Sequence, residues 1–269
     1  MEARNLKRIK GKKIGYKKGV QGGLFQTSLP SGGAVWKTYV VLAGGESKRF
    51  GKDKLIALVD GRRVIDRVLD EIGEDHVLLT VSEERCKLYG AKRCLYDNGR
   101  GPAEALLALD GSFTSLSGDL PWIKREVLER LEAFRRYFGA QVAVPLHGKG
   151  FLESLMISVE DINPIKRRLK EREIPRTLRV TDIIRISEKV VFVGSKFLSR
   201  DPRVFAHVNT QEDLKIGAPK EPLGERIVEL ELDFHPCEDP LREVELYRRY
   251  GLKQMELHAL KDLRICKGS

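Results

Sequence analysis

The sequence predicts an α/β protein with three layers, in which helices cover both faces of a mostly parallel β-sheet. After residue 37, short apolar runs alternate with longer stretches whose apolar residues recur at helical spacing. Such alternation implies helical crossovers, which join parallel strands. With 269 residues and 41% hydrophobic content, the chain can bury one sizeable core and carry a smaller extension.

Five strands and three helices are predicted in the first half of this pattern. The strands are KTYVVL (37–42), LIALV (55–59), HVLLTV (76–81), KRCLY (92–96) and SFTSLS (112–117). The helices are RRVIDRVLDEI (62–72), SEERCKLYG (82–90) and PAEALLAL (102–109). Ser82 is a typical N-cap and Gly90 a typical helix end, while Pro102 suits the first position of a helix. Asp60-Gly61 is predicted as a turn.

The second half continues the alternation and then ends in a different segment. Helices are predicted at KREVLERLEAFRRYFG (124–139), NPIKRRLKERE (163–173) and QEDLKIG (211–217), and strands at QVAVPL (141–146), ESLMISV (153–159), VVFV (190–193) and VFAHV (204–208). Residues 219–269 are predicted to form a separate, small strand–helix–strand extension from ERIVELEL, EDPLREVELYRRYG and KQMELHAL. The predicted division is therefore an N-terminal arm (1–36), a main domain (37–218) and this extension.

The net charge of +10 is concentrated in the arm. Residues 1–36 hold eight Lys or Arg and one acid, a net charge of +7, and show no apolar periodicity, so a disordered basic segment is predicted. Nucleic-acid binding through this arm is the non-enzymatic alternative. No apolar stretch approaches the roughly 18 residues of a membrane span, which predicts a soluble, cytoplasmic protein without membrane partners.

The four cysteines, at positions 86, 94, 237 and 266, form no CxxC pair, and the histidines are scattered. A zinc site is therefore not expected. Reduced, mostly buried thiols are expected, with a Cys86–Cys94 disulfide as the alternative.

Two adjacent glycines and a group of cations follow the first predicted strand. Gly44 and Gly45 come directly after it, where backbone N–H groups without side chains can approach a ligand. Arg49, Lys52 and Lys54 then supply positive charge suited to phosphate oxygens. The spacing fits neither GxxxxGK[ST] nor GxGxxG. The stretch predicts a nucleoside triphosphate site, with an ordinary glycine turn before a solvated basic loop as the alternative.

The order of these residues resembles a known signature. Leu42 to Lys54 read L-A-G-G-x-S-x-R-x-G-x-x-K, which is similar to the opening motif of nucleotidyltransferases that activate sugars and cofactors, and most closely to the molybdenum cofactor guanylyltransferase (MobA-like) family. Phe50 stands where that family most often has methionine. Later stretches fit in order: Gly101-Pro102 resembles its Gly-Pro helix start, Ser117–Ile123 (SGDLPWI) its D-x-P-x-I motif, and Val208–Leu214 (VNTQEDL) its N-T-P-E-D-L motif, with glutamine for proline.

The resemblance spans roughly residues 37–217 and implies a Rossmann-like sheet of the nucleotide-diphospho-sugar transferase type. It implies that Arg49, Lys54 and Asp119 are catalytic and that Asp119 and Asn209 hold Mg²⁺. The nucleotide-binding residues that it implies are Leu42, Ala43, Gly44, Gly45, Ser47, Arg49, Lys54, Ser82, Asp97, Gly101, Pro102 and Asp119.

Several of these positions also have simpler explanations. These are a turn aspartate at Asp119, a surface Asx-turn at Asp97, a helix cap at Ser82 and a plain helix start at Asn209, where Thr210 and Asp213 form a capping arrangement. Family members often have asparagine where this chain has the run Val81–Glu83, which leaves base recognition open. His147 and His207 have no evident partners in the sequence and are expected to be packed or exposed rather than catalytic.

The resemblance implies transfer of GMP from GTP to the phosphate of a molybdenum- or tungsten-loaded pterin cofactor, with release of pyrophosphate. GTP is favoured over CTP because Gly44, where cytidylyltransferase relatives tend to have alanine, leaves room for a purine. The alternatives are a molybdopterin cytidylyltransferase, a guanylyltransferase acting on adenosylcobinamide phosphate, and a non-catalytic regulator. Contact with carrier or acceptor proteins of the cofactor is a further expectation, whereas nucleic acid is not an expected partner.

Overall fold

The computed structural model describes residues 38–45, 50–51, 53–97, 100–172, 174, 176–232 and 240–267. The predicted basic arm (1–36) lies outside these residues. Among the described helices, none combines the length and the apolar character needed to cross a membrane.

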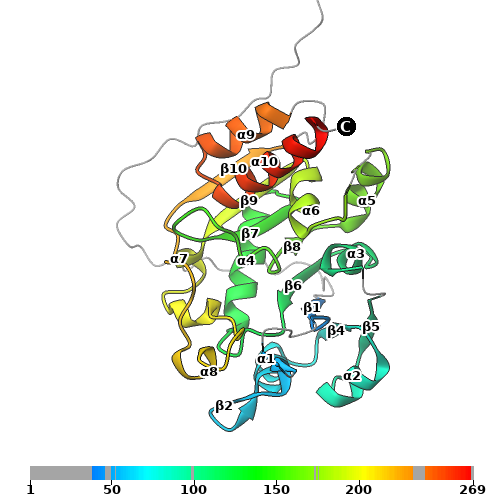
Figure 1. The fold of residues 1–269 in the computed structure, drawn as a ribbon, viewed down its shortest axis with the longest axis vertical. Coiled ribbons are helices and arrows are strands. Elements are labelled where there is room, and N and C mark those ends of the chain that lie inside the picture. Colours follow the sequence, from blue (N-terminus) through cyan, green and yellow to red (C-terminus); the bar gives the residue numbers. More distant parts are fainter. Residues whose placement is uncertain are drawn as a thin grey trace, which may run out of the picture.

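An eight-stranded, mostly parallel sheet forms the centre of the fold (Figure 1). Its strands are β1 (Tyr39–Leu42), β4 (His76–Thr80), β5 (Cys94–Tyr96), β6 (Phe113–Ser117), β7 (Val142–Leu146), β8 (Ser158–Val159), β9 (Lys189–Gly194) and β10 (Ile227–Glu231). The order across the sheet is β10-β9-β7-β8-β6-β1-β4-β5. Strands β8 and β10 run antiparallel to their neighbours, and the remaining pairs are parallel.

Helices cover both faces of this sheet and confirm the predicted three layers. They are α1 (Val64–Ile72), α2 (Glu83–Tyr89), α3 (Pro102–Leu107), α4 (Arg125–Phe138), α5 (Ile162–Lys170), α6 (Val180–Ile186), α7 (Ser195–Leu198), α8 (Asp213–Ile216), α9 (Pro240–Arg249) and α10 (Lys253–Lys267). Two short 3₁₀ helices, η1 (Lys54–Ile56) and η2 (Pro202–Phe205), and a hairpin of β2 (Leu58–Val59) and β3 (Arg62–Arg63) complete the described elements.

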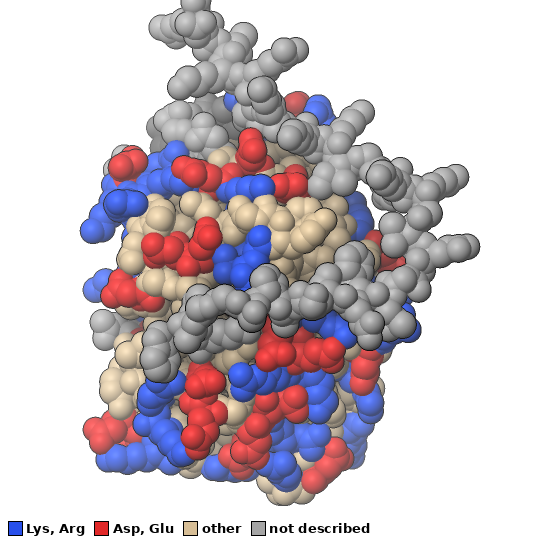
Figure 2. Space-filling model, turned by 180° about the vertical axis from the view of Figure 1, so that it is seen from behind, with Lys and Arg blue, Asp and Glu red and all other residues tan. Residues whose placement is uncertain are grey.

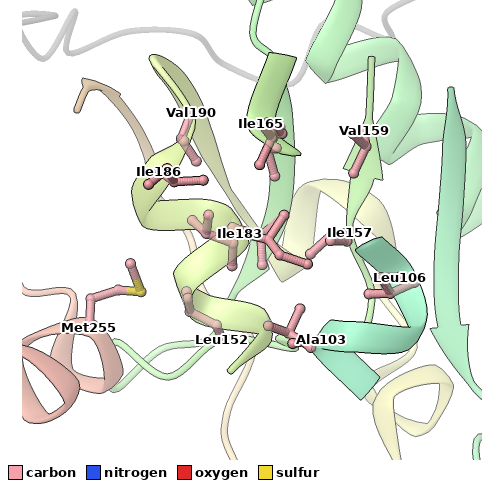
Figure 3. Close-up of a cluster of buried hydrophobic side chains, with 14 of the residues drawn as sticks. Ala103, Leu106, Leu152, Ile157, Val159, Ile165, Ile183, Ile186, Val190 and Met255 are labelled. Atoms are coloured by element: carbon pink, nitrogen blue, oxygen red, sulfur yellow. The ribbon is translucent and has the colours of Figure 1, made fainter. Parts of the chain in front are cut away.

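Two buried clusters lie on the two faces of the sheet, because successive side chains of a strand point to opposite faces. Val40 and Leu42 belong to one cluster, and Tyr39 and Val41 belong to the other. Figure 3 shows part of the first cluster, in which side chains from α3, α5 and α6 lie together with Ile157 and with Val159 of β8. The central strand β1 is thus buried on both sides, as parallel strands require.

Local signals in the sequence position several helices correctly. The Ser82 hydroxyl accepts a hydrogen bond from the Arg85 N–H at the start of α2, and Gly90 ends this helix with a φ of 69°. Pro102 opens α3 as predicted. Asp60 and Gly61, with φ of 50° and 77°, form the predicted turn between β2 and β3.

Five predicted elements are wrong in type or extent. VFAHV is not a strand, because Asp201 and Pro202 start the 3₁₀ helix η2, in which the Asp201 carboxylate accepts the Arg203 N–H. ESLMISV contributes only β8, Arg62–Arg63 belongs to a strand rather than a helix, and LIALV is split between η1 and β2. KQMELHAL is helical, since Leu252, Met255 and Ala259 form a buried stripe at helical spacing at the start of α10.

The expectation of reduced thiols is wrong for three of the cysteines. Cys86 of α2 and Cys94 of β5 form a disulfide, which is the alternative left open by the sequence. Cys266 is disulfide-bonded as well. Cys237 lies outside the described residues.

The C-terminal extension was predicted to be separate, but its strand β10 belongs to the main sheet. Strand β10 pairs antiparallel with β9, and α9 and α10 lie beside this edge (Figure 1). A buried ion-pair network joins α6 to both extension helices. Arg185 of α6 donates to Asp182, to Glu243 of α9 and to Asp262 of α10, and Arg176 bridges Asp182 and Asp262.

Acidic and basic side chains are interspersed on the face of the molecule that Figure 2 shows. Among the described residues, many exposed charges form pairs, such as Arg130 with Glu126 and Lys124 with Glu71. Pairs of this kind on an exposed surface contribute little to stability.

We expect the protein to lose stability between pH 6.5 and pH 4 because of His258 in α10. Burial, together with the charges of Arg179 and Arg185, lowers the pKa of His258 to about 4. Between these pH values the unfolded chain therefore binds a proton at His258 that the folded chain does not. The contribution of neutral His258 to the free energy of unfolding is complete above about pH 6.5 and is lost as the pH falls toward about 4. After allowance for solvent screening the loss is about 2 kcal/mol. Urea unfolding at both pH values should show a smaller loss in His258→Gln, and an equal loss would contradict the assignment.

Candidate active site

The carboxyl ends of β1, β4 and β6 meet at one edge of the sheet. Leu42 of β1 is in register with Leu79 of β4 and with Ser117 of β6. The segments that follow β1 and β6 therefore begin side by side, where open α/β sheets bind their ligands. A cleft of about 970 Å³ opens at this edge.

The glycine turn after β1 lies along this cleft. The Ala43 N–H donates to Leu79 O over 2.8 Å, which continues the β1–β4 pairing up to the turn. A Cβ atom at Gly44 would lie 3.3 Å from the Asp97 carboxylate, whereas a Cβ atom at Gly45 would meet nothing within 4 Å. The lack of a side chain at Gly44 thus lets the Asp97 carboxylate approach the turn closely.

A lysine, an aspartate and an asparagine meet at the centre of the cleft. The Lys54 ammonium, from η1, contacts the Asp119 carboxylate and lies 3.2 Å from the Asn209 side-chain oxygen. The turn after β6 places Asp119, which is almost fully buried. Asn209 is fixed locally, because Asp213 accepts the backbone N–H groups of Asn209 and Thr210. Asn209 can therefore belong to the capping arrangement of α8 and to the candidate site at the same time.

His207 joins Asp119 to a second buried acid. Its Nδ1 lies 2.7 Å from Asp119 Oδ1, and its Nε2 lies 2.8 Å from Glu153 Oε2. Burial opposes a charge on His207, but the charge of Glu153 and the hydrogen bond to Asp119 raise the pKa of the imidazole to about 10. The imidazolium therefore keeps both protons near neutral pH and donates to a carboxylate on each side.

Both acids remain ionised despite their burial. Desolvation opposes the charge of Asp119, but the hydrogen bond and charge of His207 and the charge of Lys54 hold the pKa of Asp119 well below its usual range. The charge of His207, its hydrogen bond and the nearby His147, whose Nε2 lies 3.9 Å from Glu153 Oε2, similarly outweigh desolvation and lower the pKa of Glu153 to about 2. His147 also lies 3.2 Å from the Ser195 hydroxyl. The expectation that His207 is merely packed or exposed is therefore incomplete, because it holds the central carboxylate.

The donor set at the centre fits a magnesium ion that is bound together with a nucleotide. Among the described residues, no three His, Cys, Asp or Glu side chains are placed to hold a metal ion. Mg²⁺, however, keeps several waters and usually takes one or two protein oxygens together with substrate phosphates. Asp119 and Asn209 present one carboxylate and one amide oxygen to the same cation, the Lys54 ammonium. These oxygens are the chemical type that Mg²⁺ prefers.

Most of the predicted nucleotide-binding residues line this one cleft. Its lining includes Leu42, Ala43, Gly44, Gly45, Lys54, Asp97, Gly101, Pro102 and Asp119. Asn209, which was predicted as a metal ligand, lines the cleft as well. Ser82 is not, and its hydroxyl caps α2 instead. Ser47 and Arg49 lie outside the described residues, as does Lys52. Glu153, His147 and His207 also line the cleft, although the sequence did not predict them there.

The family described as the MobA-like NTP transferase domain matches residues 39–186, which is more than half of the chain. The chain belongs to this family. It is therefore an NTP transferase, and the resemblance seen in the sequence is confirmed.

Curated relatives of this MobA-like chain carry one common description. A probable molybdenum cofactor guanylyltransferase from Bacillus subtilis is 28% identical over 186 residues, covering 65% of this chain and 90% of that protein. A protein of the same description from Thermococcus kodakarensis is 27% identical over 198 residues, covering 66% and 92%.

A solved structure confirms the fold of the MobA-like chain. Molybdopterin-guanine dinucleotide biosynthesis protein A from Archaeoglobus fulgidus aligns with a TM-score of 0.56 at 22% identity, covering 67% of this chain and 96% of that one. The predicted sheet of the nucleotide-diphospho-sugar transferase type is thus confirmed.

Proposed function

We propose that this MobA-like enzyme transfers GMP from GTP to the phosphate of a molybdopterin cofactor and releases pyrophosphate. The observation that carries the proposal is the meeting of the Gly44-Gly45 turn, Lys54 and Asp119 in one cleft. The descriptions of the relatives from Bacillus subtilis and Thermococcus kodakarensis support the choice of acceptor.

The reaction joins two phosphate groups and needs no general base. An oxygen of the acceptor phosphate, already ionised near neutral pH, attacks the α-phosphorus of GTP. The bond from that phosphorus to the bridging oxygen breaks, and pyrophosphate leaves with the electron pair. Catalysis then consists of positioning and of charge neutralisation. His207 is unsuited to accept a proton, since both ring nitrogens donate to carboxylates.

The chain supplies two kinds of group that can offset the negative charge of the phosphates. The glycine turn offers backbone N–H groups to the nucleotide, and Arg49 and Lys54 supply positive charge for the triphosphate. Asp119 and Asn209 would hold Mg²⁺, which offsets negative charge on the phosphates when it is bound. Buried Asp119 keeps its negative charge because His207 donates to it, so the carboxylate remains available to a cation.

Purified protein incubated with Mg²⁺, GTP or CTP, and molybdopterin tests the proposal. We expect pyrophosphate release with GTP that requires both Mg²⁺ and molybdopterin. Adenosylcobinamide phosphate serves as the competing acceptor, and CTP as the competing nucleotide. The proposal is contradicted if pyrophosphate is released only when adenosylcobinamide phosphate is the acceptor, or only when CTP is the nucleotide.

Gly44→Ala should reduce the preference for GTP over CTP. The added Cβ atom would lie 3.3 Å from the Asp97 carboxylate and 3.6 Å from the Val81 side chain, so Asp97 must shift. In the proposed site Asp97 contacts the guanine base, and displacing this contact costs about 1.4 kcal/mol, or about tenfold in GTP affinity. Isothermal titration with both nucleotides measures the ratio. Gly45→Ala is the matched control, because its Cβ atom meets nothing within 4 Å of this protein. If the ratio of the affinities for GTP and CTP is unchanged in Gly44→Ala, Asp97 does not take part in recognition of the base.

A further inference from the structure

Part of the cleft lining, here called the acceptor half, contains none of the predicted nucleotide-binding residues and is joined to Asp119 through His207. Phe151, Leu155 and Phe205 supply apolar surface there, and Lys220 and Gln254 supply polar groups. An acceptor that attacks in line must approach the α-phosphorus from the side opposite to pyrophosphate. This half is therefore the part of the cleft open to the acceptor.

Two residues of this half come from the C-terminal extension. Lys220 precedes β10, and Gln254 lies in the first turn of α10. Both lie outside residues 39–186, which match the family. The acceptor half of the cleft is thus built partly from a segment beyond the matched domain.

The extension is docked tightly on the loop that carries Leu152 and Glu153. The Gln254 N–H donates to Gly150 O over 3.1 Å, and the Gln254 side-chain oxygen accepts the Leu152 N–H over 2.8 Å. A Cβ atom at Gly150, whose φ is +84°, would overlap the backbone of Gly251. Leu152 and Met255 of α10 also belong to one buried cluster (Figure 3). The loop and the start of α10 therefore occupy fixed positions relative to one another.

The same loop leads directly to the central carboxylate. Glu153 follows Leu152, accepts from His207, and His207 in turn donates to Asp119. Gln254 is thus connected to the centre of the cleft by its hydrogen bond to Leu152, by the peptide bond from Leu152 to Glu153, and by the hydrogen bonds of His207. A side chain of the extension can in this way influence where an acceptor lies relative to Asp119.

We propose that the extension completes the acceptor site, and that Gln254 and Lys220 determine which acceptor is used. This inference rests on the proposed function. The acceptor that suits this half is a phosphate monoester on a flat ring system with hydrogen-bonding edges. The aromatic surfaces of Phe151 and Phe205 suit the ring, the Lys220 ammonium suits the phosphate, and the Gln254 amide carries donors for a ring edge.

Steady-state kinetics of two variants with GTP and molybdopterin tests this inference. Gln254→Ala is expected to raise the KM for molybdopterin about tenfold, the effect of one lost hydrogen bond, while the KM for GTP stays within about twofold. Lys220→Gln, an exposed position whose replacement leaves the fold intact, should raise the same KM. Gln141→Ala is the matched control, because Gln141 also accepts a backbone N–H, that of Glu188, over 2.8 Å, but does not line the cleft.

The outcomes separate this inference from the proposed function. Unchanged KM values for molybdopterin in both variants of an active enzyme overturn the inference and leave the function intact. Equal rises in the KM for GTP and for molybdopterin overturn it too, because they indicate a general structural effect. Failure of the wild-type protein to transfer GMP to molybdopterin contradicts the proposed function itself, and with it the inference.

Discussion

Asp119→Asn is expected to lower kcat for nucleotidyl transfer at least about 100-fold, the usual effect of losing one charged contact in a water-poor site. Asparagine has the same shape, but it cannot neutralise the cations that Asp119 contacts. The carboxylate accepts from His207 over 2.7 Å and pairs with the Lys54 ammonium. Turnover under saturating GTP and Mg²⁺ measures the effect.

A second measurement separates lost catalysis from lost folding in Asp119→Asn. The Asp119 backbone oxygen accepts the Val208 N–H over 3.0 Å, and this contact remains in the variant. We expect the urea unfolding transition to remain cooperative while Mg²⁺-dependent GTP binding weakens. Asp110→Asn is the control, since Asp110 is exposed and pairs with Lys166 away from the cleft. Turnover of Asp119→Asn within threefold of the wild-type value would remove Asp119 from the catalytic centre.

Local sequence signals predicted those parts of the fold that depend on neighbouring residues. Ser82 caps α2 and Pro102 opens α3, because caps are short-range interactions. Tertiary contacts decided the parts that were missed. In KQMELHAL both the strand period and the helix period fit. The burial of Met255 and Ala259 in one cluster with Val228 and Leu230 of β10 selects the helix.

The site residues that were predicted correctly are those that belong to sequence motifs at the ends of strands. The register of Leu42 with Leu79 and Ser117 brings these ends together, so separate motifs converge. The pair of Glu153 and His207 was missed, because the two residues are 54 positions apart and no local pattern joins them. The available signal was a charged residue inside each of two apolar runs, since a buried charge requires a partner.

Arg185→Met is expected to lower the free energy of unfolding by about 3–5 kcal/mol, the usual effect of removing one partner from a buried ion pair. Arg185 and Asp182 are each 1% exposed. The guanidinium also donates to Asp262 and to Glu243 over 2.6 Å. Its loss leaves the Glu243 carboxylate without this cation. It also removes one of two cations from Asp182 and one of three from Asp262, which Arg176 and Arg179 contact as well. Urea unfolding monitored by circular dichroism measures the change.

Arg62→Met is the matched control, because Arg62 pairs with Asp70 at a surface where both are more than half exposed, and about 1 kcal/mol or less is expected there. Arg185→Lys should recover only part of the loss, since an ammonium cannot serve three carboxylates with the planar fork of a guanidinium. Because the network joins α6 to α9 and α10, the start of α10 at Gln254 should loosen as well, and the KM for the acceptor should rise before the KM for GTP does. If Arg185→Met is as stable as Arg62→Met, the network does not hold the extension in place. The docking inferred for Gln254 must then depend on its own hydrogen bonds to Gly150 and Leu152 and on the apolar contacts of α10.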